Sequence, residues 1–126
     1  MKAGDVFRFV GGDDDHLWLV ISDPSLDSAN VLLVNITTWR ADKEQTCLVN
    51  PGDHSAIKHN SCIYYRGSRV HSDAQLNYLF NANRLVLYDD PASPELLARI
   101  REGAVASKMM RLDHGMILID QGLVEP

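Results

Sequence analysis

Two histidines and a lysine lie close together in one short stretch of this chain. Residues 47–65 read CLVNPGDHSAIKHNSCIYY and include His54, Lys58 and His59. Histidine titrates near neutral pH, so it can act as a general acid or as a general base. A lysine beside such a pair can stabilise negative charge that develops in a transition state. We therefore take His54, Lys58 and His59 as the candidate catalytic residues.

The same part of the sequence is basic, although the whole chain is acidic. Residues 54–71 include Lys58, Arg66 and Arg69 and contain no Asp or Glu, whereas the chain has 12 Lys and Arg against 17 Asp and Glu, a net charge of -5. An acidic balance argues against a general nucleic-acid-binding protein, which would normally carry a basic excess. A local basic patch still favours an anionic ligand. The alternative is a chance segregation of charge on a small domain.

A metal site or a cofactor is not expected. His54 and His59 could be two metal ligands, but Asp53 is the only further ligand type close to them in sequence, and we predict no metal. The two cysteines, Cys47 and Cys62, have neither a CxxC nor a zinc-ligand spacing. We interpret both as buried thiols that act as small hydrophobic residues.

Length and composition predict one domain spanning residues 1–126. The chain is 45% hydrophobic and 23% charged, which is typical of a globular protein. It has no apolar run of 18 residues, so no membrane span is expected. The N-terminal sequence MKAGDVFRFVGGDDDH lacks the apolar run of a signal peptide. We therefore expect a cytoplasmic protein.

The hydrophobic pattern predicts strands first and helices later. Turn residues GGDDD separate the first two strands, and we expect a turn or bulge at Gly67. Ser72 and Ser93 are suited to cap two helices, while the tail DHGMILIDQGLVEP could form a helix or a strand. The expected strands cover 5–10, 16–22, 30–39, 44–50, 62–65 and 84–88, and the expected helices cover 73–82 and 94–107. Closely spaced strands with late helices favour a small, bent β-barrel.

Spacing adds a condition on the candidate catalytic residues. In a regular strand His54 and Lys58 would share one face, and His59 would point to the other face. If all three surround one anion, residues 53–60 must form a loop or a bulge. Asn60 could supply the turn.

Four segments in order resemble the PemK/MazF-like toxin family. They are GDVFRF, HLWLVISDP, NVLLVNITT and PGDHSAIKHNSCIYY, the last being similar to a GDH-x-x-I-x-H-x-S element of a divergent branch. The resemblance implies a mainly β fold, an SH3-like barrel with two or three short α-helices in the C-terminal half. It also implies a homodimeric toxin that cleaves single-stranded RNA without metal and is restrained by a cognate antitoxin.

The resemblance also bears on individual residues. Thr37 and Thr38 match positions beside the RNA groove of the family. The family has a basic residue and a proline before its second strand, and this chain has His16 and Leu17 there. Its best-known catalytic arginine is therefore missing, and whether His16 replaces that arginine stays open.

The remaining predicted binding residues are chosen by residue type and position. Arg40 follows the third strand and could reach the same groove, and Ser61 could hold the loop. Tyr65 could stack on a base, and Arg66 could contact a phosphate. An alternative function needs no catalysis. The chain could be an inactive SH3-like binding module that recognises a protein or a nucleic acid.

Overall fold

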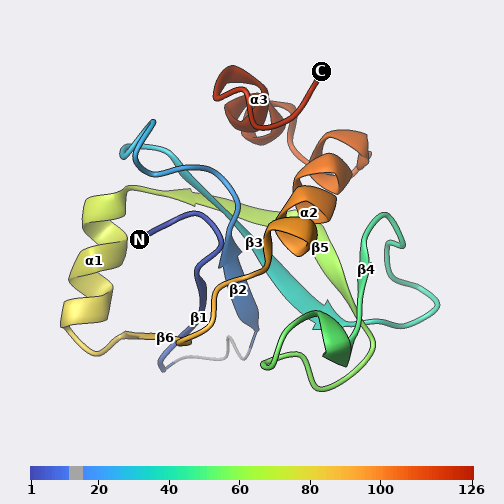
Figure 1. Ribbon diagram of the computed structural model, residues 1–126, viewed down its shortest axis with the longest axis horizontal. Coiled ribbons are helices and arrows are strands. Elements are labelled where there is room, and N and C mark those ends of the chain that lie inside the picture. The colour runs from blue at the N-terminus through green and yellow to red at the C-terminus, as the bar shows by residue number, and fades with distance from the viewer. Residues whose placement is uncertain (12–15) are drawn as a thin grey trace.

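A six-stranded antiparallel sheet forms the centre of the molecule, with three helices mostly in the C-terminal half (Figure 1). The computed structural model describes residues 1–11 and 16–126, so the acidic residues 13–15 of the predicted turn lie outside the described residues. Strand order is β4-β5-β3-β2-β1-β6. The strands are β1 (Val6–Phe9), β2 (Leu17–Val20), β3 (Val31–Thr38), β4 (Leu48–Val49), β5 (Ser61–His71) and β6 (Leu85–Leu87), and the helices are α1 (Asp73–Asn81), α2 (Pro94–Ala106) and α3 (Leu112–Asp120).

The predicted strands are all present, but two differ in length from the expectation. The segment expected to pair over 44–50 pairs only at Leu48 and Val49. The short strand expected at 62–65 is the first part of β5, which continues to His71. The register between β3 and β5 shifts between Leu33 and Asn35, whose partners are Arg69 and Tyr64. The extra residues of β5 lie around Gly67, so the predicted bulge is confirmed.

The sheet is open, which corrects the expectation of a closed barrel. Within the described residues, β4 pairs only with β5 and β6 pairs only with β1, so the two edges of the sheet do not meet. Both edge strands are very short, with two and three residues.

The strands bury both faces because helices pack on each. On one face Leu32, Val34 and Ile36 of β3 pack with residues of α2 and α3, among them Ile100 and Leu118. The other face forms a second cluster that includes Leu76 of α1. The full list of that second cluster is Phe7, Trp18, Val20, Val31, Leu33, Leu76 and Leu85. Burial on both sides explains the nearly continuous apolar sequences of β2 and β3.

The helix caps follow the sequence signals. The Ser72 hydroxyl accepts a hydrogen bond from the backbone N–H of Gln75 at 3.0 Å, and Ser93 caps α2 in the same way. Along α2, Leu96, Leu97, Ile100 and Ala104 are buried, whereas Val105 is exposed. The ambiguous tail forms α3. Within the described residues, none of the helices has the length and hydropathy that a membrane crossing requires.

Candidate functional site

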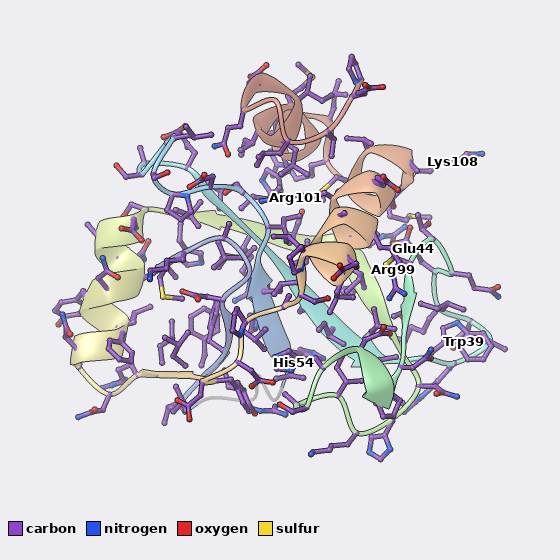
Figure 2. All side chains as sticks on the ribbon, in the orientation of Figure 1. Trp39, Glu44, His54, Arg99, Arg101 and Lys108 are labelled. Carbon is purple, nitrogen blue, oxygen red and sulfur yellow. The ribbon has the colours of Figure 1, made fainter. Side chains whose placement is uncertain are left out.

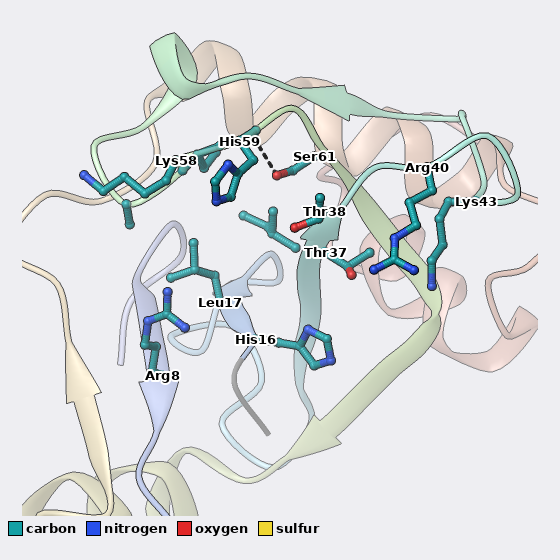
Figure 3. A pocket seen from close by; sticks show the side chains of 13 residues that line it. Arg8, His16, Leu17, Thr37, Thr38, Arg40, Lys43, Lys58, His59 and Ser61 are labelled. Carbon is teal, nitrogen blue, oxygen red and sulfur yellow. Dashed lines mark hydrogen bonds between the residues drawn. The ribbon is translucent and has the colours of Figure 1, made fainter. Parts of the chain in front are cut away.

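A cavity of about 500 Å³ opens at the end of the sheet where β3 ends and β2 and β5 begin (Figure 3). Lys58 and His59 reach it from the loop before β5, and Arg40 and Lys43 reach it from the turn after β3. The described residues that line it are Arg8, His16, Leu17, Ile36, Thr37, Thr38, Arg40, Lys43, Ala56, Ile57, Lys58, His59 and Ser61. We call this space the cationic cavity.

Positive charge dominates the described lining. It includes four Arg and Lys side chains and two histidines, and it includes no Asp or Glu. A concave surface with charge of one sign concentrates ligands of the opposite charge. Hydroxyl groups of Thr37 and Thr38 add neutral hydrogen-bond donors at the same place. The arrangement is suited to bind a phosphate or another anion.

The loop between β4 and β5 carries Lys58 and His59, and its first half is anchored. A 3-10 turn covers Pro51–Asp53. An Asp53 carboxylate oxygen accepts a hydrogen bond from the backbone N–H of Asn50 at 2.7 Å and pairs with Arg99 of α2 at 3.2 Å. The rest of residues 54–60 is irregular, as the spacing argument required. The prediction of a loop in place of a strand is therefore confirmed.

His54, labelled in Figure 2, belongs to the anchored half of the loop and is not among the described residues that line the cavity. It is 7% exposed. Its Nε2 lies 2.7 Å from the backbone oxygen of Asp90, and its Nδ1 accepts a hydrogen bond from the N–H of Ala56 at 3.0 Å. Both ring nitrogens are thus engaged by backbone groups. This corrects its assignment to the candidate catalytic residues, because it has no nitrogen left for a substrate in this conformation.

Asp90 connects to the same anchor through its side chain. The Ser55 hydroxyl donates a hydrogen bond to Asp90 Oδ2 at 2.6 Å, and this bond holds the pKa of Asp90 below its usual value. The carboxylate also lies 3.4 Å from His54 Nε2. Residues 54 and 55 are therefore attached to the segment that leads into α2.

Lys58, His59 and Ser61 lie where the prediction placed them, at the cavity. Lys58 and His59 are exposed. The Ser61 hydroxyl donates a hydrogen bond to the backbone oxygen of His59 at 2.8 Å, and the Asn60 oxygen accepts one from the N–H of Trp39 at 3.0 Å. These two bonds fix the end of the loop beside β3. The predicted holding role of Ser61 is therefore consistent with its contact.

Thr37, Thr38 and Arg40 also line the cavity, as expected. Thr37 and Thr38 are paired with the start of β5, and Arg40 follows in the turn. The Lys43 N–H donates to the Arg40 oxygen at 2.9 Å, which closes this turn and brings Lys43 to the same side. Pairing of β3 with β5 therefore places the threonines next to the histidine loop.

Two predicted binding residues are placed elsewhere. Tyr65 is fully buried, and its hydroxyl donates a hydrogen bond to the Ile100 oxygen of α2 at 2.7 Å. Burial raises the pKa of this phenol well above its ordinary value. Arg66 is exposed, and its guanidinium lies 2.9 Å from the sulfur of Met109. Neither is among the described lining residues of the cationic cavity. Burial corrects the assignment of Tyr65 as a base-stacking residue, whereas the phosphate contact of Arg66 stays a prediction.

Three basic lining residues, Arg8, His16 and Lys43, were not predicted as site residues. Arg8 belongs to β1, and the alternating pattern VFRF was the only sign that its side chain leaves the core. Lys43 lies only three residues after Arg40, but nothing in its spacing showed that the turn would fold back. His16 lines the cavity at the place where the resemblance expects a basic residue. Within the described residues, no group of three or more potential metal ligands is present.

Comparisons with known proteins do not assign the chain to a family. A scan against models of protein families gives no match, and a search of curated proteins gives none either. The resemblance to PemK/MazF-like toxins is thus carried by short motifs and their order alone.

Proposed function

We propose that the protein is a toxin-like endoribonuclease that binds single-stranded RNA in the cationic cavity and cleaves it without a metal ion. The observation that carries the proposal is the described lining of that cavity, with four Arg and Lys side chains, two histidines and no carboxylate. RNA supplies a phosphate for the cations and a 2′-hydroxyl for an acid–base pair. The proposal includes a homodimer and a cognate antitoxin, as in type II toxin–antitoxin systems.

The proposed chemistry is transfer of the phosphate to the neighbouring 2′-oxygen. One neutral histidine removes the 2′-hydroxyl proton, and the 2′-oxygen forms a bond to phosphorus. The bond from phosphorus to the 5′-oxygen breaks, and a protonated histidine donates the proton that this oxygen needs. The products are a 2′,3′-cyclic phosphate and a 5′-hydroxyl end. Lys58 and Arg40 stabilise the charge on the phosphorane.

His59 and His16 are the pair that we propose for the two proton transfers. Both line the cavity, whereas His54 is held by backbone groups outside it. His16 thereby takes the part that the sequence analysis gave to His54. In the same proposal, the open sheet is structurally related to the SH3-like barrel of PemK/MazF-like proteins but is not closed.

The test is cleavage of a labelled single-stranded RNA in the presence of a chelator. His59→Ala and His16→Ala should each lower the rate by roughly 10²–10⁴-fold, and chelation should leave the parent rate unchanged. The rate should be bell-shaped in pH, because one histidine must be neutral and the other charged. His71→Ala is the matched control, since His71 contacts Gln75 outside the cavity. Unchanged cleavage by both cavity variants would contradict the proposal.

Assembly is tested separately. Light scattering at micromolar concentration should give twice the chain mass of 14.1 kDa, because short unpaired edge strands and exposed apolar side chains leave surface to bury. A monomer at that concentration would contradict the dimer but leave the site proposal standing.

The second candidate function is binding of single-stranded RNA without cleavage. The specific observation in its favour is His54, because this histidine, one of the two that the sequence suggested as catalysts, is 7% exposed and is bonded at both ring nitrogens. In that case RNA would bind with a strong salt dependence, and no cyclic phosphate product would form at any pH.

A further inference from the structure

A second cavity, of about 650 Å³, lies beside the cationic cavity, and the two share His16. It is placed on the sheet face that also packs against α1. The described residues that line it are His16, Trp18, Asn35, Tyr64, Gly67, Ser68 and Arg69. Its lining differs from that of the cationic cavity, because it has two aromatic side chains and a carboxamide, and Arg69 is its one Arg or Lys among the described residues.

Strand pairing sets the floor of this second cavity. Asn35 is paired with Trp18 on one side and with Tyr64 on the other, so the three side chains form one row across β2, β3 and β5. Arg69 lies over the Trp18 ring at 4.6 Å, and Trp18 itself is 1% exposed. Tyr64 is the half-buried ring of the row. It is therefore the aromatic surface that a ligand in this cavity can reach.

Asn35 is an unusual residue for its position. It interrupts the apolar sequence of β3 and is only 4% exposed. Its Oδ1 is buried and has no hydrogen-bond partner within the described residues. A buried polar atom without a partner lowers stability, so a polar side chain kept there points to a ligand that donates a hydrogen bond.

The bulge in β5 keeps the second cavity narrow around Gly67. A Cβ atom on Gly67 would lie 2.7 Å from a ring carbon of Tyr64 and 2.8 Å from Asn35 Nδ2. Any side chain at position 67 would therefore press on both residues. The bulge brings bare backbone against Tyr64 and Asn35 and shapes the second cavity around them.

We propose that the second cavity is a subsite for a nucleobase that carries an exocyclic amino group, and that Asn35 Oδ1 accepts the hydrogen bond from that group. The inference rests on the proposed RNA function and adds base preference to it. A base is planar and can lie against Tyr64, and a phosphate of the same strand can reach the cationic cavity through the shared edge at His16. Lys43 lines the cationic cavity, and its Nζ lies 5.6 Å from the ring centre of Tyr64, which lines the second cavity. Lys43 is therefore close to both cavities.

Cytosine and uracil are the sharpest pair of probes. They have the same size and the same charge, but cytosine has an amino group where uracil has a carbonyl oxygen, which would face Asn35 Oδ1 unfavourably. Octamers of each, with a fluorescent label, should bind the parent protein with affinities that differ by about tenfold in favour of cytosine. The readout is fluorescence anisotropy at fixed salt, with no cleavage required.

Asn35→Leu keeps the number and branching of the side-chain heavy atoms and removes the acceptor. It should bring the cytosine-to-uracil ratio close to one, because cytosine loses its hydrogen bond and uracil loses its repulsion from Oδ1. Its melting temperature should be equal to or higher than that of the parent, because an unpaired polar group has been removed. A purely structural role of Asn35 predicts the opposite, a lower melting temperature and an unchanged ratio.

Gly67→Ala is the second variant, and it tests the subsite while Asn35 keeps its acceptor oxygen. The added methyl group should close the subsite and reduce the ratio, while Lys58→Ala should weaken both octamers equally. A parent ratio near one, or a ratio that survives in Asn35→Leu, would overturn the subsite and leave the RNA proposal intact. If neither octamer binds the parent protein, both proposals fail.

Discussion

The two halves of the loop between β4 and β5 come from one stretch of sequence but have different roles. In the first half, Asp53 and His54 are tied to Arg99 and Asp90 by an ion pair and a hydrogen bond. In the second half, Lys58 and His59 are exposed and line the cationic cavity. Clustering of histidines in sequence therefore does not tell which one meets a ligand, because burial and backbone partners decide it.

The largest expected effect is on the free energy of unfolding, at the point where the two halves of the loop join. Ile57 is 3% exposed and packs in the main core, so Ile57→Ala should lower the free energy of unfolding by about 2–5 kcal/mol. Lys58→Ala, one residue further on, should change it by less than about 0.5 kcal/mol. Urea unfolding of both variants measures the difference. Equal effects would contradict the division of the loop.

A smaller loss is expected when the anchor itself is removed. His54→Ala should lower the free energy of unfolding by about 1–3 kcal/mol, because the buried N–H of Ala56 and the backbone oxygen of Asp90 lose their partner. His59→Ala should leave stability unchanged within about 0.5 kcal/mol. If His54→Ala proved as stable as the parent, the structural role of His54 would be refuted.

The second half of the loop should show its role in binding, with no effect on stability. Lys58→Ala should reduce the slope of log affinity for single-stranded RNA against log salt by about 1, as expected when one phosphate contact is lost. Lys108, an exposed lysine outside the described lining of the cavity, gives the control variant Lys108→Ala. Identical salt slopes in the two variants would place the phosphate elsewhere.

The smallest expected effect is on the pH dependence of stability, and it comes from His114 of α3. Burial lowers the pKa of His114 below its ordinary value of 6.5, while its neighbours Asp113 and Arg111 act in opposite directions. The unfolded chain therefore binds a proton more readily, and the free energy of unfolding should fall as pH drops below about 6.5. In His114→Gln this fall should be smaller. Parallel pH profiles of parent and variant would contradict the shift.

Local patterns in the sequence were enough to predict the strands, the helix caps and the bulge at Gly67. Each of these depends on residues close together in the chain, such as Ser72 three positions before Gln75. The open edges of the sheet were not predictable in this way. They depend on how far β4 and β6 extend and on where α2 packs, and these are long-range contacts.

The site was predictable in part for the same reason. Lys58, His59 and Ser61 follow from their own stretch of sequence, whereas Thr37 was suggested by the family resemblance, and its pairing with β5 is seen only in the structure. Arg8 comes from a strand far away in the chain, so no spacing could connect it to the loop. Tyr65 and Tyr64 had to point to opposite sides, and only the packing of α2 shows that Tyr65 is the inward one.

Anchoring of the loop has a consequence for the thermodynamics of ligand capture. Since the ion pair of Asp53 with Arg99 and the bond from His54 to Asp90 hold the backbone of residues 51–56 before any ligand arrives, no segment there has to order itself on binding. The entropy lost should then be confined to a few flexible tips such as Lys58. Calorimetry should accordingly show a small change in heat capacity, as expected for a rigid receptor in place of one that folds around its ligand.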